Sequence, residues 1–225
     1  MKVCRLLNLA LSAWLFSAVA FTVATDAQAQ GNANFEAGIA AYQANDLPLA
    51  YKSFLVAAKE GHADSQFNVA LMYERGIGIG KDEKEAVVWY SKAASQGSAV
   101  AQFNLAVLYE NGRGTEIDFA KANEWYRRAS AQGDALAIGN LGMLYLRGQG
   151  VKENKIAGAA LLLLSATLDR SPENHAKQNL SATPGLTSEM VVAARALSEK
   201  FSSATNLLVP LDQYLTESDN SNREK

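Results

Sequence analysis

Residue types that support metal or thiol chemistry are almost missing from this sequence of 225 residues. It has one cysteine, Cys4, and two histidines, His62 and His175. Neither histidine has a cysteine or a second histidine at the spacing of a zinc site, so we expect no metal. The patterns G-x-S-x-G, H-E-x-x-H and, after the first 29 residues, S-x-x-K are also missing. The sequence therefore predicts neither an enzyme nor a cofactor.

Charge is sparse and nearly balanced. The chain has 21 Lys and Arg against 23 Asp and Glu, a net charge of -2. This balance provides no basic surface for nucleic acid or anionic lipid. The glycine-rich segment 76–81 superficially matches a phosphate-binding loop. However, Arg75 stands where the first glycine is needed, and Asp82 follows Lys81 where Ser or Thr is needed. We expect no nucleic acid and no nucleotide.

The first 29 residues have the pattern of an export signal. Lys2 and Arg5 precede an apolar run over residues 6–20, and the Ala-Gln-Ala sequence ending at Ala29 fits a cleavage site. We expect cleavage after Ala29, which gives a periplasmic or secreted protein without a membrane span. Retention of this segment as a membrane anchor is the alternative. The mature chain then has no cysteine, so packing alone stabilises it.

A 36-residue pattern occurs three times between residues 63 and 170. An asparagine, a tyrosine, a Gly-x-Gly pair and a Trp-Tyr pair recur at this period, and the last of these becomes Leu161-Leu162 in the third copy. The recurring positions are Asn68, Asn104 and Asn140; Tyr73, Tyr109 and Tyr145; Gly76, Gly112 and Gly148; Trp89 and Trp125. A period of this length is typical of stacked helical units, each of which buries its neighbour's apolar face.

Each repeat is predicted to contain two helices joined by a glycine turn. In the first copy, apolar side chains at helical spacing run from Ala63 to Tyr73, and Gly76 then permits a left-handed turn. An Asp or Asn that is suited to cap a helix precedes each second helix. These residues are Asp46, Asp82, Asp118 and Asn154. The Trp-Tyr pairs have the spacing of core residues.

The repeat divides the chain into segments. We expect a signal peptide at 1–29, an atypical N-terminal capping repeat at 30–62, repeats at 63–98, 99–134 and 135–170, C-terminal capping helices at 171–209, and a polar flexible tail at 210–225.

The repeated sequence resembles Sel1-like repeats, which are related to tetratricopeptide repeats, in an exported bacterial protein. The shared pattern is A-x-x-Q-x-N-L-(G/A)-x-(M/L)-Y-x-x-G-x-G followed by K-A-x-x-W-Y-x-(K/R)-A-A-x-x-G. It is strongest over 63–134, and Gly139 departs from it by replacing Phe. The resemblance implies an all-α, right-handed α-solenoid of antiparallel helix pairs that acts as a protein-binding scaffold. Lactam-hydrolysing activity has been claimed for members with cysteines paired within repeats. We do not transfer it, because the mature chain has none.

The same resemblance implies that side chains of the first helices line a concave, partner-binding face. These residues are Asp64, Phe67, Leu71, Glu74, Val100, Phe103, Val107, Glu110, Leu136, Met143 and Leu146. Phe67 and Phe103 fit inter-repeat core equally well. We expect the partner to be an envelope or membrane protein of signalling or assembly. A secreted effector that binds a host protein, or a cell-wall or lactam hydrolase, is the alternative.

Overall fold

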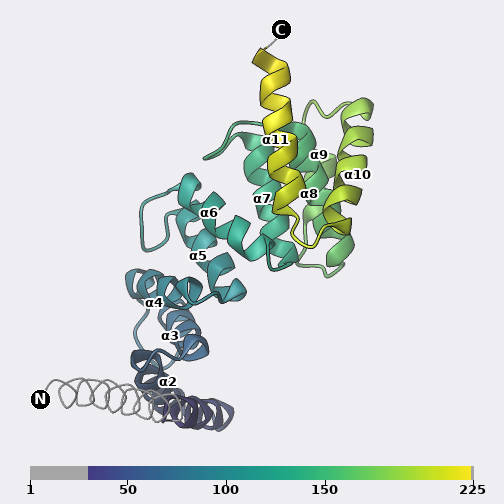
Figure 1. Cartoon of the computed structure of the whole chain (residues 1–225). Helices are drawn as coiled ribbons and strands as arrows, with labels where there is room; N and C mark the ends of the chain where they lie inside the picture. Colours follow the sequence, from purple (N-terminus) through teal and green to yellow (C-terminus); the bar gives the residue numbers. More distant parts are fainter. Residues whose placement is uncertain (1–29, 224–225) are drawn as a thin grey trace, which may run out of the picture. The chain divides into compact units, whose positions relative to one another are not determined.

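The computed structural model describes residues 30–223, and all regular structure in this range is helical (Figure 1). The predicted signal peptide lies outside the described residues. The described residues divide into two compact units, which meet between Asp82 and Glu83 of the chain. No helix within 30–223 is long and apolar enough to cross a membrane.

The first unit contains three helices among its described residues. Helical backbone over residues 30–43 is followed by α2 (Leu47–Lys59) and α3 (Ala63–Arg75). The side chain of Asp46 accepts a hydrogen bond from the backbone N–H of Leu49 and so caps α2, as predicted. Phe54 of α2 is buried, and its ring centroid lies 5.8 Å from that of Phe35. Residues 30–59 therefore form a helical hairpin with its own aromatic contact.

The second unit contains eight helices in the described range. They are α4 (Glu83–Ser95), α5 (Ala99–Asn111), α6 (Phe119–Ser130), α7 (Ala135–Arg147), α8 (Lys155–Leu168), α9 (Ala176–Ala182), α10 (Ser188–Ser203) and α11 (Leu208–Arg223). Helices α5 and α7 each pair with the helix before and the helix after them in the chain. The predicted caps of α6 and α8 are confirmed, because Asp118 and Asn154 accept from the N–H groups of Lys121 and Ala157.

Glycine turns join the two helices of each repeat. Gly76, Gly112 and Gly148 have φ of 70°, 65° and 63°, and each donates its N–H to the carbonyl four residues earlier. The second glycine of each pair has a different role. A Cβ on Gly150 would lie 2.4 Å from the backbone carbonyl of Phe119 at the start of α6. The second glycine therefore lets the loop of one repeat touch the preceding second helix.

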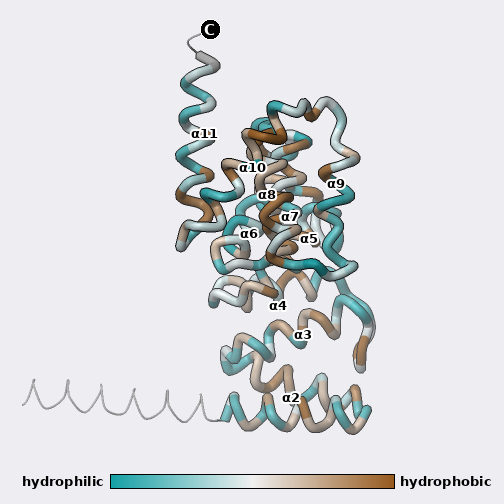
Figure 2. Tube along the Cα trace, turned by 90° about the vertical axis from the view of Figure 1, so that its right-hand side faces the viewer, coloured by the Kyte–Doolittle hydropathy of each residue, from teal (hydrophilic) through white to brown (hydrophobic). Residues whose placement is uncertain are grey.

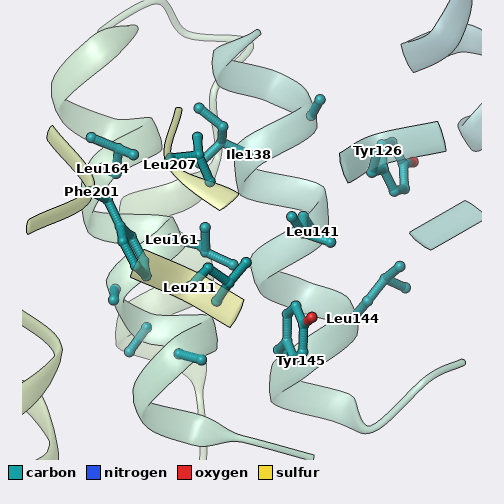
Figure 3. Close-up of a cluster of buried hydrophobic side chains, with 14 of the residues drawn as sticks. Tyr126, Ile138, Leu141, Leu144, Tyr145, Leu161, Leu164, Phe201, Leu207 and Leu211 are labelled. Atoms are coloured by element: carbon teal, nitrogen blue, oxygen red, sulfur yellow. The ribbon is translucent and has the colours of Figure 1, made fainter. Parts of the chain in front are cut away.

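The main core of the second unit lies between α7, α8, α10 and the start of α11 (Figure 3). Helices α7 and α8 approach closely because glycines face each other across their contact. A Cβ on Gly142 would lie 2.8 Å from the carbonyl oxygen of Gly158. The leucine run of α8 is buried on two sides, since Leu161 joins the main core and Leu162 joins a second cluster that includes Ala176 of α9.

The end of the chain corrects the sequence prediction. Residues 210–225 were expected to form a polar flexible tail, but α11 continues to Arg223. Figure 2 shows hydrophobic residues gathered at the start of α11 and a mostly hydrophilic remainder. Leu211 is fully buried in the main core, and Arg127 of α6 holds Asp212 through two hydrogen bonds of 2.6 and 2.7 Å. Few but well-placed apolar residues therefore dock a helix whose average composition is polar.

Candidate protein-interaction surface

In the first unit, α3 contributes four of the predicted partner-binding residues. Asp64 is exposed, whereas Phe67, Leu71 and Glu74 are half-buried. Leu71 lies in an open groove of about 270 Å³. The groove is lined by Ile39, Tyr42, Phe54, Asn68, Leu71, Met72, Arg75 and Ile77. It is mainly apolar, with the polar groups of Asn68 and Arg75 on α3.

In the second unit, α5 presents four more. Val100 is 52% exposed. Phe103 and Val107 are half-buried and pack against the main core. The ring of Phe103 lies 6.0 Å from that of Tyr126, measured between centroids. Both rings belong to the second repeat, so this contact joins the two helices of one repeat and gives Phe103 an intramolecular role.

Glu110, the last predicted residue of α5, belongs to a polar network. Its carboxylate accepts a hydrogen bond of 2.6 Å from the hydroxyl of Tyr126, which in turn accepts from the amide of Asn140 at 2.9 Å. Tyr126 is fully buried, and burial together with the charge of Glu110 raises the pKa of its phenol well above the usual value. Glu110 is thus occupied by its own fold and is a weaker binding candidate than Val100.

Helix α7 supplies Leu136, Met143 and Leu146, and here one prediction is wrong. Leu136 and Met143 are half-buried, but Leu146 is only 7% exposed. It packs with Leu162, Ala166 and Ala176. The repeat placed Leu146 in register with Glu74 and Glu110. A cap helix, α9, reaches this position only after the third repeat, and it converts Leu146 into core.

An open cavity of about 400 Å³ lies beside Met143 where α7, α8 and the end of α9 meet. Its lining is Met143, Leu146, Arg147, Glu153, Lys155, Asn179, Ala182, Thr183 and Pro184. Lys155 donates to the backbone carbonyl of Pro184 and lies 3.8 Å from the carboxylate of Glu153. The cavity mixes an apolar floor with charged side chains.

The comparisons with known proteins agree with this geometry. The Sel1 repeat family model matches residues 63–98, 99–134 and 135–169. Residues 63–169 are three Sel1 repeats. The chain also resembles the crystal structure of a Sel1 repeat protein from Oxalobacter formigenes, with 33% identity, a TM-score of 0.56, and coverage of 68% of this chain and 64% of that one. No curated protein matches the chain.

A second Sel1-like structure supports the fold alone. It is c5321, a protective antigen present in uropathogenic Escherichia coli strains displaying an SLR fold, at 24% identity and a TM-score of 0.53. The match covers 83% of this chain and 48% of that protein. The aligned part of this chain thus spans about two thirds of the first structure and about half of the second. The all-α solenoid expected from the sequence is confirmed. Sel1 repeat proteins generally act in protein–protein interaction and are typically non-enzymatic scaffolds.

Sequence reasoning missed one recurring role in these Sel1 repeats. The glutamine of the pattern lies buried in the first two copies. In each copy, its side-chain amide donates a hydrogen bond of 3.1 Å to a backbone carbonyl near the end of the preceding second helix. Gln66 donates to Ala58, and Gln102 donates to Ala94. The recurrence was visible in the sequence, but its contact was not. This glutamine is therefore a structural residue of the repeat.

Proposed function

We propose that this Sel1 repeat protein is an exported adaptor that binds another protein through the open face of its first helices. The observation that carries the proposal is Val100, an apolar side chain left exposed on the first helix of a repeat whose core positions are already filled. Contiguous exposed apolar surface is typical of interaction sites, and Leu136 is a further partly exposed apolar side chain at the same position one repeat later. The export pattern at 1–29 favours a periplasmic partner in envelope signalling or assembly.

The remaining first-helix residues differ in their value for binding. Asp64, Leu71, Val100, Leu136 and Met143 retain exposed or half-exposed surface. Phe103, Val107, Glu110 and Leu146 have intramolecular contacts that account for them. The proposed surface is therefore narrower than the full row of predicted residues, and it is considered separately within each unit.

A photoreactive amino acid at Val100 tests this proposal in the cells that make the protein. Val88 of α4 is 45% exposed and lies on a second helix, so it is a matched control. We expect illumination to give one dominant adduct from Val100 and none of that size from Val88. Leu71→Glu combined with Leu136→Glu is expected to abolish the adduct while circular dichroism remains helical. An adduct that is equal from both positions, or one that survives the double substitution, contradicts the proposal.

Cell fractionation tests the proposed location. We expect the protein in the periplasmic fraction. Recovery mainly from the culture medium would instead favour the secreted effector, for which the partner is a host protein.

A further inference from the structure

The two cavities described above hold an arginine at the same repeat position. Arg75 ends α3 and lines the groove of the first unit; Arg147 ends α7 and lines the cavity of the second. They are 72 residues, or two repeats, apart in the sequence. Each lies one helical turn after an apolar lining residue, Leu71 or Met143. The same combination of an apolar side chain and a guanidinium therefore occurs twice.

Neither arginine side chain has a partner within the part of the chain that the structure describes, as both are exposed and form no hydrogen bond or ion pair there. Two arginines of α6 are engaged by contrast, since Arg127 holds Asp212 and Arg128 holds Glu124. In the middle repeat the corresponding residue is Asn111, whose amide donates to the carbonyl of Val107 in its own helix at 2.8 Å. Of the three equivalent repeat positions, 75 and 147 therefore offer an unused planar donor, whereas 111 does not.

The charges around each arginine favour an anion. In the first groove, Arg75 is the one charged side chain of the lining. In the second cavity, Glu153 and Lys155 lie 3.8 Å apart and offset each other, which leaves the charge of Arg147 uncompensated. Guanidinium groups bind carboxylates through two parallel hydrogen bonds. The amide of Asn68 adds a further donor in the first groove.

The sizes of the cavities favour side chains over cofactors. Volumes of about 270 and 400 Å³ are near the lower end of the roughly 300–1,000 Å³ typical of small-molecule sites. Both are open to solvent on one side, as is expected for a surface that receives a peptide. A leucine, methionine or phenylalanine side chain suits the apolar floor, and a carboxylate one or two residues away suits the arginine.

We propose that the two cavities bind peptide segments of the partner in which an aspartate or glutamate stands next to a large apolar residue. The carboxylate pairs with Arg75 or Arg147, and the apolar side chain packs on Leu71 or Met143. This inference rests on the proposed function and deepens it, because it names the chemistry of the partner. Recognition is local, since the protein as a whole carries a net charge of -2 and does not attract acidic segments over long range.

Selection from a displayed library of random 12-residue peptides on the full purified protein tests the proposal without a known partner. We expect the recovered peptides to be enriched in Asp or Glu within two positions of Leu, Met or Phe. A synthetic copy of a recovered peptide is expected to bind about tenfold more weakly to Arg75→Gln or to Arg147→Gln, because a charge-assisted bidentate pair is lost. Arg195→Gln is the control, as it removes an exposed arginine of α10 that lines neither cavity.

Replacing the acidic residue of the same peptide by its amide completes a double-mutant cycle. The replacement is expected to weaken binding to the unaltered protein about tenfold and to have no further effect on the arginine variant that already lost affinity. The inference is overturned if the recovered peptides show no enrichment in acidic residues. It is also overturned if the amide replacement weakens binding equally in the presence and absence of the arginine. The inference is also overturned if the unaltered protein selects only peptides that the variant with both Arg75→Gln and Arg147→Gln also selects. The crosslinked adduct from Val100 tests the proposed function separately from these peptide-binding results, so the failure of one proposal is distinguishable from the failure of the other.

Discussion

Substituting Gly150 by alanine tests whether the second glycine of each turn is needed for contact between repeats. Its φ is 67°, and an added Cβ would lie 2.4 Å from the carbonyl carbon and oxygen of Phe119 and 2.7 Å from the backbone nitrogen of Ala120. These neighbours are backbone atoms at the start of α6, so they move only if the helix moves. Gly133 is the matched control, since its φ is 86° and nothing lies within 4 Å of its added Cβ.

The two substitutions share one cost and differ in another. An alanine with positive φ costs about 1–2 kcal/mol, partly offset by about 0.4–1 kcal/mol from the reduced entropy of the unfolded chain. Gly133→Ala is therefore expected to lower the free energy of unfolding by about 1 kcal/mol. Forcing a methyl group against packed backbone adds about 1–3 kcal/mol, so Gly150→Ala is expected to lose about 2–4 kcal/mol.

Urea unfolding of the purified protein, followed by far-ultraviolet circular dichroism, measures both values. Repeat arrays gain much of their stability from nearest-neighbour interfaces, so the loss at Gly150 is expected to weaken the contact of the second and third repeats first. Equal losses for the two variants would refute the reasoning, because only the strain of positive φ would then remain.

Three further predictions concern the second unit. Leu211→Asp places a carboxylate in the core at a cost on the order of 4 kcal/mol, so hydrogen exchange is expected to show α11 undocked. Tyr126 keeps its proton when folded, whereas an unfolded phenol ionises near pH 10.0; the free energy of unfolding is therefore expected to fall by up to about 1.4 kcal/mol per pH unit above this value. Asp134 caps α7, so Asp134→Ala is expected to cost about 1 kcal/mol in urea unfolding.

Each of these has a control within the chain. Val209 of α11 is 66% exposed, so Val209→Asp is expected to leave exchange in α11 unchanged; rapid exchange in both variants would contradict the docking role of Leu211. Tyr126→Phe is expected to flatten the alkaline decline, and an unchanged slope would assign it to other tyrosines. Asp134→Asn retains a capping oxygen, so a loss equal to that of Asp134→Ala would exclude the cap as the cause.

The candidate site was only partly predictable from the sequence. The resemblance to Sel1-like repeats placed Val100, Leu136 and Met143 on the open face of first helices, and the structure gives each of them partial or full exposure. It also placed Leu146 there, because register alone does not report which later segment covers a position. Arg75 and Arg147 were visible as positions that differ from the middle repeat, but their cavities required the side chains of other helices.

The sequence by itself determined the helices of the repeats, their caps and their turns. These depend on interactions within a few residues, such as Asp118 with the N–H of Lys121 or the positive φ of Gly112, and the 36-residue period repeats them. Tertiary structure alone decided which faces are covered. The pair of Arg127 with Asp212 joins residues 85 positions apart. Contacts of this kind depend on complementary shape and charge between distant segments, and no local pattern records them.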